Sequence, residues 1–324
     1  MLWRSLVSDM EKDYGHKSVL LDECLEALAI RPDGIYLDGT LGRAGHSLEI
    51  LRRLTTGRLI GVDRDMTAIE AAKERLAEFG DRFTPVHSNF SELDRVLEDL
   101  GLVGQIDGML FDLGVSSPQL DEAQRGFSYM QDAPLDMRMD STAALDAHEV
   151  VNTWSGEELK RILRDYGEER YAPQIARAIE RRREMKPIET TLELVDVIRS
   201  AMPAAALREK QHPAKRSFQA IRIAVNGELD ALPPMLEAAT RGLRCGGRLA
   251  VITFHSLEDR IVKQTMRDLA TGCTCPPEFP VCVCGNHPKL KLVSRKPIVS
   301  GAAELEENPR ARSAKLRVAE RTEY

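Results

Sequence analysis

The sequence lacks any apolar run long enough to cross a lipid bilayer. The longest runs, such as residues 249–254 (LAVITF), fall far short of the roughly 18 to 20 residues that a membrane-spanning helix needs. Residues 1–15 also lack a signal-peptide core, because Asp9, Glu11 and Asp13 directly follow the few apolar residues at the start. We therefore expect a cytoplasmic protein with no membrane partner.

Glycine and proline are too scarce for a collagen-like or mainly disordered chain. The 324 residues include 22 Gly and 16 Pro, and 43% are hydrophobic and 30% charged. This composition is ordinary for a folded enzyme. The length suggests about two domains, or one domain with a large insertion.

Cysteine is sparse, with only 6 residues in the chain, and a disulfide scaffold is not indicated. Cys24 and Cys245 stand alone and are expected to be buried as small hydrophobes. The other four form a tight C-x-C-x6-C-x-C cluster: Cys273, Cys275, Cys282 and Cys284. Four thiolates so close together could hold a tetrahedral zinc ion, but a Pro-rich surface loop of reduced thiols is the alternative. The sequence alone assigns no metal.

The net charge of −6 conceals two basic regions. Residues 155–225 carry 15 Lys and Arg against 11 Asp and Glu, and residues 286–324 carry 9 against 5. Local basic surfaces on an acidic chain fit a polyanionic partner such as RNA, because phosphate binding releases counterions. Solvated helix faces explain the same charges equally well.

Short β-rich runs alternate with amphipathic segments from residue 34 to 113, the order that produces a parallel sheet covered by helices. The clearest helix spans residues 65–79, with Asp65 placed to cap its start and Gly80 after its end. The predicted strands are 34–40, 58–64, 83–89 and 106–114.

This alternation stops between residues 119 and 225, where charged helix-forming segments are broken by prolines. The sheet pattern resumes with a helix, a turn at residues 245–247 and a strand at 248–254. Residues 313–322 alternate apolar and charged side chains, as a half-exposed edge strand should. We therefore expect one α/β domain formed by residues 1–120 and 226–324, with a helical insertion at 121–225.

A glycine-rich loop follows the first predicted strand, in residues 38–46 (DGTLGRAGH). Its G-x-x-G-x-x-G spacing differs from the dinucleotide fingerprint, and no Gly-Lys-Ser/Thr closes it as in a Walker A loop. By itself the loop is either a ligand site or a plain tight turn. Asp63 ends the second strand, 18 residues beyond Gly45, where an acidic side chain accepts hydrogen bonds from ribose hydroxyls. Together these features predict a nucleoside site.

Polar and aromatic residues also follow the third and fourth strands. Open α/β sheets bind ligands at this carboxyl edge. Phe90 is either an adenine platform or a core residue. The residues expected at this edge are Asn89, Phe90, Asp112, Ser116, Ser117 and Gln119.

Several segments, spread over residues 16–322, resemble the bacterial 16S ribosomal RNA cytosine-N4 methyltransferase family. The most specific are DLGVSSPQLD and PLDMRMD, with HPAKRSFQAIRIAVN and GGRLAVITFHSLEDR among the others. The resemblance implies methyl transfer from S-adenosylmethionine to a decoding-region cytidine of the small ribosomal subunit. It also implies a class I methyltransferase fold: a Rossmann-like, doubly wound sheet, mostly parallel with an antiparallel C-terminal edge strand. The helical insertion would then meet the RNA.

The same resemblance places cofactor ligands at Ala44, Gly45, His46, Asp63, Phe90, Asp112 and Gln119. Ala44 stands where many relatives have glycine, which is tolerable if its φ is negative. Many amino-methyltransferases carry an Asp/Asn-Pro-Pro-aromatic tetrad after the fourth strand, and DLGVSSP occupies its place here. We therefore expect the turn at residues 112–117 to contact the reacting atoms, with Asp112 shared between cofactor binding and catalysis.

The insertion and the fifth strand offer further candidates. Phe218 is a stacking platform or, at helical spacing with Ile221 and Val225, a core residue. His255 at the end of the fifth strand is a structural group or a substrate contact. Candidate phosphate ligands are Lys215, Arg216 and Arg222. The run Arg181, Arg182 and Arg183 is either a phosphate clamp or a solvated helix end.

Two other functions compete with the methyltransferase. A nicotinamide-dependent dehydrogenase is disfavoured by the missing dinucleotide fingerprint. A non-catalytic RNA-binding factor for ribosome assembly, with a nucleoside crevice, would carry the same basic regions. The oligomeric state is not predicted.

Overall fold

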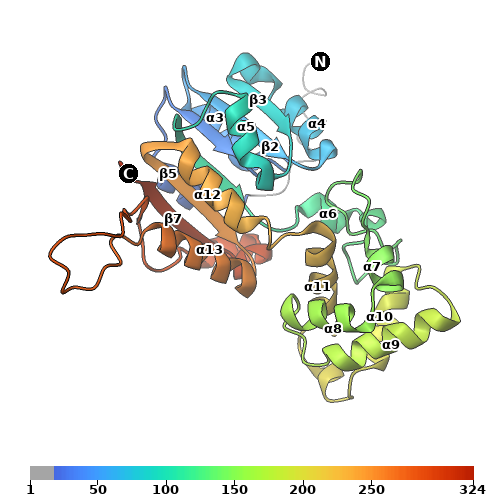
Figure 1. Cartoon of the computed structure of the whole chain (residues 1–324). Helices are drawn as coiled ribbons and strands as arrows, with labels where there is room; N and C mark the ends of the chain where they lie inside the picture. The colour runs from blue at the N-terminus through green and yellow to red at the C-terminus, as the bar shows by residue number, and fades with distance from the viewer. Residues whose placement is uncertain (1–17) are drawn as a thin grey trace, which may run out of the picture.

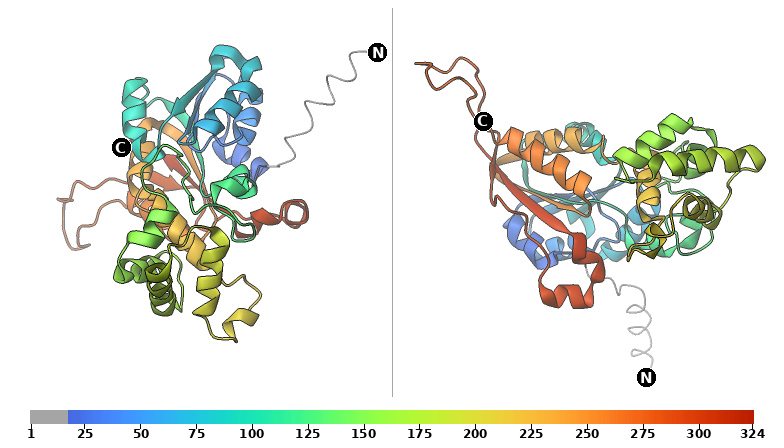
Figure 2. Two further views of the ribbon diagram at one scale, coloured as in Figure 1. Left: turned by 90° about the vertical axis from the view of Figure 1, so that its right-hand side faces the viewer. Right: turned by 90° about the horizontal axis from the view of Figure 1, so that it is seen from below.

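The computed structural model describes residues 18–324, so the expectation about a signal peptide in residues 1–15 lies outside the described part. A seven-stranded sheet carries helices on both faces (Figures 1 and 2). The strand order is β3-β2-β1-β4-β5-β7-β6, in which β7 runs antiparallel to both of its neighbours and the other pairs are parallel. The strands are β1 Ile35–Asp38, β2 Arg58–Asp63, β3 Phe83–His87, β4 Ile106–Asp112, β5 Leu243–Thr253, β6 Leu290–Leu292 and β7 Lys315–Arg321.

The helices fall into those that cover the sheet and those that form a region beside it (Figure 1). The first group comprises α2 Leu21–Leu28, α3 Gly45–Arg53, α4 Met66–Arg75, α5 Leu93–Asp99, α12 Leu232–Gly242 and α13 Ser256–Leu269. The second comprises α7 Ala147–Thr153, α8 Gly156–Asp165, α9 Ala172–Met185, α10 Thr191–Ser200 and α11 Lys215–Asn226. The short helices are α6 Ser117–Asp121 and α14 Ala302–Glu307, with 3-10 turns at Ala77–Arg82, Phe90–Glu92, Ala123–Arg125, Ala206–Arg208 and Pro309–Ser313. Of the described helices, none is long and apolar enough to pass through a membrane.

Both faces of the sheet are buried, which explains why its central strands are apolar throughout. In β5, Leu249 and Val251 face the layer of α5, α12 and α13, whereas Ala250 and Ile252 face the layer of α2, α3 and α4. The alternation follows from the two-residue period of a strand. Helices therefore cover both faces of the central strands, which leaves the strand ends free to hold a ligand.

Helices α7 to α11 pack around a hydrophobic cluster of their own. Its fully buried members include Ile162, Ile175 and Ile221. Phe218 belongs to this cluster and is 3% exposed, so the core interpretation of Phe218 is confirmed and base stacking by this ring is wrong.

The four predicted strands at residues 34–114 are confirmed, each ending within two residues of its expected position. The predicted helix at 65–79 stops at Arg75, and a 3-10 turn in which Gly80 has a φ of 52° leads into β3. The predicted turn at 245–247 is instead an irregularity inside β5, with Gly246 at a φ of 77° and a register shift opposite β4. Cys245 lies there and is exposed, so its expected burial is wrong.

The C-terminal strand is antiparallel, as predicted, but it is not the outermost one. β6 pairs with the free side of β7 and forms the edge of the sheet. Leu316 and Val318 of β7 are buried in the cluster that packs on α2, α3 and α4. β6 is only three residues long and follows an irregular loop, so its sequence shows too little alternation to predict a strand.

Candidate functional site

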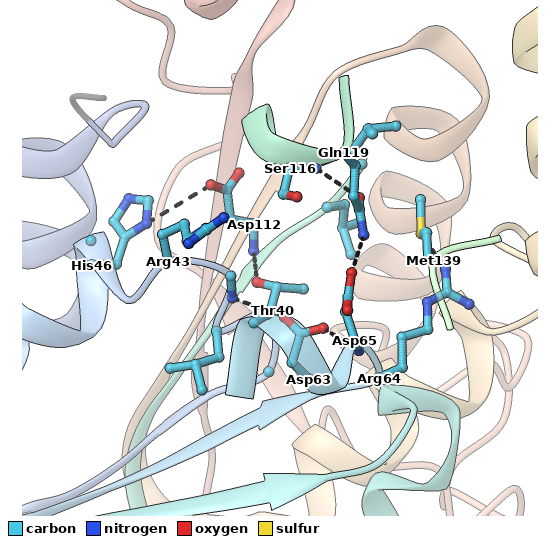
Figure 3. Close-up of a pocket in the computed structure, with 18 of the residues that line it drawn as sticks. Thr40, Arg43, His46, Asp63, Arg64, Asp65, Asp112, Ser116, Gln119 and Met139 are labelled. Carbon is cyan, nitrogen blue, oxygen red and sulfur yellow. Dashed lines mark hydrogen bonds and ion pairs between the residues drawn. The ribbon is translucent and has the colours of Figure 1, made fainter. Parts of the chain in front are cut away.

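A cavity of about 530 Å³ opens at the carboxyl ends of β1, β2, β3 and β4 (Figure 3). The ends of all these strands contribute lining residues, as the crevice predicted from the sequence requires. Six of the seven cofactor ligands implied by the resemblance line it: Gly45, His46, Asp63, Phe90, Asp112 and Gln119.

Ala44 is the exception among those seven residues. Its φ is +58°, so the condition under which alanine would be tolerated without strain is not met, and its side chain is fully buried in the hydrophobic core. Its backbone N–H donates to the carbonyl of Leu41, and its carbonyl accepts from Leu48. An alanine in the left-handed region costs roughly 1 to 2 kcal/mol, and burial of the methyl group offsets part of that.

The loop after β1 is held by Asp38, whose carboxylate is buried beneath it. One oxygen accepts the Ser47 hydroxyl at 2.7 Å, and the other accepts the Thr40 N–H at 3.2 Å. Burial raises the pKa of Asp38 to about 6, although these hydrogen bonds act to lower it. Glycine is required at residue 39, where a Cβ would lie 2.1 Å from the Phe111 ring. The loop backbone thereby forms one wall of the cavity.

Asp63 stands at the end of β2 and joins this wall to the next loop. Its Oδ2 accepts the Gly42 N–H at 2.8 Å, and its Oδ1 accepts the Asp65 N–H at 2.8 Å. Burial raises the pKa of Asp63, and the two backbone hydrogen bonds oppose the rise. Each carboxylate oxygen has a second lone pair, so the group retains acceptor capacity for the ribose hydroxyls of a nucleoside.

Phe90 lines the cavity after β3 and also packs on the core. Its ring meets Phe111 edge to face, with centroids 6.3 Å apart. Asn89 is the N-cap of the short turn that carries Phe90 and accepts the Ser91 N–H. The two alternatives for Phe90 are therefore compatible, because one side of the ring packs on the core and another faces the cavity.

Asp112 ends β4 and faces the cavity (Figure 3). Its N–H donates to Thr40 Oγ1 at 2.6 Å, and its Oδ2 lies 3.8 Å from His46 Nδ1. The Nε2 of His46 is 3.0 Å from the Val19 carbonyl, which orients the ring. The other carboxylate oxygen of Asp112, Oδ1, is buried and has no hydrogen-bond partner among the residues that the structure describes.

The surroundings of Asp112 favour its neutral form. Burial raises the pKa of Asp112 to about 6; His46 opposes the rise, and the carboxylates of Asp38 and Glu258 add to it. An unsatisfied buried acceptor costs about 1 to 3 kcal/mol. Because Oδ1 is closed off from the cavity, a bound amine or hydroxyl would meet the other oxygen, Oδ2, of this partly exposed side chain.

Gln119 reaches the cavity from α6, and both ends of its amide are engaged. Its Oε1 accepts the Ser116 N–H at 3.1 Å, and its Nε2 donates to Asp65 Oδ2 at 3.1 Å (Figure 3). Ser116 also lines the cavity, whereas the side chain of Ser117 lies outside the described part. Asp65 caps α4 as predicted, by accepting the Thr67 N–H.

On the other side, the cavity is lined by Met139, which lies in the helical region (residues 121–225), and by Glu228, two residues after the end of α11. Arg64, directly after β2, donates to the Asn226 carbonyl at 2.9 Å and contacts the Met139 sulfur (Figure 3). Sequence reasoning missed this connection, because no local pattern links residue 64 to residue 226.

Glu258 is a second cavity residue that the sequence analysis missed. It is buried, and its Oε2 accepts the Phe254 N–H at 2.9 Å. His255 is the N-cap of α13, with its Nε2 3.0 Å from Glu258 Oε1, and is not among the lining residues. The two form a capping box, a pattern that H-S-L-E at a strand end could have revealed.

Most of the predicted phosphate ligands are engaged within the protein. The prediction that Arg222 binds a phosphate is wrong, because its guanidinium forms a largely buried ion pair with Glu228 at 2.8 Å. Arg216 donates to the Glu168 carbonyl, whereas Lys215 is exposed. In the arginine run, residue 181 is exposed, residue 182 donates to the Lys186 carbonyl and residue 183 to that of Val151.

Comparison with known proteins places these residues in context. The model of the MraW methylase family matches residues 13–322. The Ribosomal RNA small subunit methyltransferase H of Heliobacterium modesticaldum is 58% identical over 309 residues, which cover 95% of this chain and 99% of that protein. The protein of the same name from Symbiobacterium thermophilum is 59% identical over 305 residues, covering 94% and 96%. Among solved structures, an rRNA methylase from Streptococcus thermophilus is a distant likeness, with 11% identity, a TM-score of 0.38 and 94% of each chain covered.

Proposed function

The chain belongs to the MraW methylase family, and from this premise we propose that it methylates the exocyclic N4 of a cytidine in the decoding region of 16S ribosomal RNA. The enzyme is an S-adenosylmethionine-dependent methyltransferase of class I fold. Membership of this family leaves no support for the dehydrogenase alternative. The names of the relatives support small-subunit ribosomal RNA as the substrate, and the assignment to N4 of a cytidine rests on the sequence resemblance.

The residues that line the cavity are suited to hold S-adenosylmethionine, the methyl donor. Asp63 offers acceptor capacity to ribose hydroxyls, Phe90 offers a ring face to an adenine, and the loop at residues 39–46 lets a ligand lie against backbone. When bound, S-adenosylmethionine supplies an electrophilic methyl group. The protein's own contribution is to orient both reactants and to exclude water.

The observation that carries the proposal is the partly exposed carboxylate of Asp112 at the wall of this cavity, with its Oδ2 held 3.8 Å from His46 Nδ1. The N4 amine of cytosine is a poor nucleophile, because its lone pair is delocalised into the ring. A carboxylate that accepts one of its hydrogens favours rehybridisation and thus raises its nucleophilicity. Asp112 is therefore proposed as the catalytic residue and, through its neighbours, as part of the cofactor site.

The helical region at residues 121–225 is proposed as the part that meets the RNA. It contributes Met139 to the cavity, so an RNA bound along it would lie beside Asp112. Lys215 is exposed at the start of α11 and is available to a phosphate. A target base would have to leave its stack to enter the site. Such a substrate places the enzyme in the cytoplasm, where small ribosomal subunits are made.

Asp112→Asn tests the proposal, with the exposed Asp99→Asn as the matched control. Donor binding is measured by calorimetry, and methyl transfer by mass spectrometry of nucleosides from small subunits isolated from cells that lack the enzyme. We expect N4-methylcytidine with the control and at least a hundredfold slower formation with Asp112→Asn while donor binding persists. Full activity of Asp112→Asn would overturn its catalytic role.

The same assay tests the substrate. Methylation of another nucleoside would contradict the N4 assignment. If the wild-type protein binds subunits but transfers no methyl group, the non-catalytic assembly factor would be favoured instead.

A further inference from the structure

The four clustered cysteines lie on a loop that takes no part in the site described above. Residues 271–288, all within the described part of the chain, form neither helix nor strand between α13 and β6. The loop projects from the sheet region on the side away from helices α7 to α11 (Figures 1 and 2). Any role of these thiols is therefore separate from methyl transfer.

The four sulfur atoms form a compact group. All of them lie within 4.8 Å of one another. Cys282 Sγ is 3.3 Å from Cys273, 3.5 Å from Cys284 and 4.0 Å from Cys275, and the Cys273 and Cys284 sulfurs are 3.7 Å apart. With Zn–S bonds of about 2.3 Å, the edges of a zinc tetrathiolate tetrahedron are about 3.8 Å. The observed spacing is that of four ligands around one ion.

Backbone N–H groups point at these sulfurs, as expected for thiolates. Cys284 Sγ accepts from the Thr274 and Asn286 N–H groups, each at 3.4 Å, and Cys275 Sγ accepts from Val283 at 3.3 Å. Hydrogen bonds to the charged form of a group favour that form. The loop thus offers both the geometry and the electrostatic support of a metal site.

Hydrophobic burial does not explain why the loop holds this shape. Its three large apolar side chains are exposed: Phe279 by 50%, Val281 by 70% and Val283 by 74%. A segment without a core of its own can instead gain order from a cross-link such as a disulfide or a bound metal. The cysteines are free thiols here, because no disulfide joins any of the described cysteines.

We propose that Cys273, Cys275, Cys282 and Cys284 bind one structural zinc ion. Coordination forms four Zn–S bonds and releases four thiol protons, with no change of oxidation state. The protein fills all four positions, so no position is left for water or substrate, as in structural rather than catalytic zinc sites. The Asn286 side chain closes the base of the loop by donating to the carbonyls of Thr271 and Gly272.

The test is the metal content of the full-length protein, purified without chelators or metal-affinity resin and measured by plasma mass spectrometry. Cys282→Ser removes the sulfur that contacts the other three, and Cys245→Ser removes an exposed cysteine outside the cluster. We expect about one zinc per chain in the wild type and in Cys245→Ser, and at least a tenfold lower content in Cys282→Ser.

A second measurement does not depend on the folding of a variant. Wild-type protein in which zinc is replaced by Co²⁺ should show the visible absorption bands of a tetrahedral tetrathiolate, and proteolysis of the loop should accelerate when the metal is removed. Unchanged zinc in Cys282→Ser, iron in place of zinc, metal-free wild type from zinc-supplemented cells, or disulfides in protein prepared without oxygen would each overturn the proposal.

Discussion

Asp65 Oδ2 lies 2.9 Å from Arg125 Nη1, an ion pair that joins the end of β2 to the start of the helical region. Burial alone would raise the pKa of Asp65, but hydrogen bonds from Thr67 and Gln119 and the charge of Arg125 outweigh it and lower the pKa. The other end of the guanidinium donates to the carbonyls of Arg138 and Met139. Asp65 and Arg125 thereby set the position of two walls of the cavity.

Arg125→Ala should destabilise the protein strongly, because it leaves the Asp65 carboxylate buried without its counter-charge. We expect a loss of about 3 kcal/mol in the free energy of unfolding, measured by denaturant titration. The control is Arg95→Ala, which breaks two solvent-exposed pairs and should cost less than about 0.5 kcal/mol. Equal effects of the two substitutions would show that the buried pair contributes nothing special.

Methyl transfer should depend on pH through Asp112. Because its pKa is raised to about 6, the carboxylate gains a proton and loses its acceptor role as the pH falls through that value. The rate at saturating donor should therefore fall about tenfold per pH unit well below pH 6. Asp112→Asn should have a low rate with no such acid limb, and a wild-type rate that stays flat from pH 7 to pH 5 would contradict this.

The contribution of Asp112 to the free energy of unfolding should change with pH in the direction opposite to that of a salt-bridged carboxylate. The folded state binds the proton more tightly than the unfolded state, so the contribution of Asp112 to stability is full below its ordinary pKa near 4 and is lost as the pH rises through about 6. Between pH 4.5 and 7.5, Asp112→Asn should therefore lose less unfolding free energy than the wild type. A steeper loss in the variant would refute the assigned direction.

Gly39→Ala should damage both folding and donor binding. The added methyl group would lie 2.1 Å from the ring of Phe111, which is fully buried. We expect a loss of about 2 kcal/mol or more in unfolding free energy, with weaker donor binding by calorimetry. The control is Gly301→Ala, where a Cβ meets nothing within 4 Å; a comparable loss there would argue against the steric explanation.

Phe218 and Lys215 both lie in α11, but substitution of Phe218 should reduce stability, whereas substitution of Lys215 should weaken RNA binding. Phe218→Ala leaves a cavity in the core of the helical region and should cost about 3 to 5 kcal/mol of stability. Lys215→Ala should leave stability within about 0.5 kcal/mol but weaken RNA binding and reduce its salt dependence by about one ion. Subunit-binding titrations at several salt concentrations check this, and an unchanged salt dependence would exclude Lys215 from the phosphate contacts.

Much of the cavity could be predicted from local pattern. Strand ends in a parallel sheet share one edge, so Asp63, Phe90 and Asp112 could be placed together once their strands were identified. The N-cap role of Asp65 likewise followed from its position before an amphipathic helix. The left-handed φ of Ala44 could not be foreseen, because the surrounding loop imposes it against the preference of alanine.

The sequence by itself determined the alternating strand and helix order, the ligand-bearing edge of the sheet and the apolar stripes of the helical region, since each is written in short-range periodicity. Only the tertiary structure decided which charged groups are engaged, as when Arg222 pairs with Glu228 rather than with solvent or phosphate. It also decided that Asp112 carries an unpartnered oxygen and that four cysteine sulfurs converge. The physical reason is that pairing, desolvation and coordination depend on distances between residues remote in the chain, which spacing along the sequence does not encode.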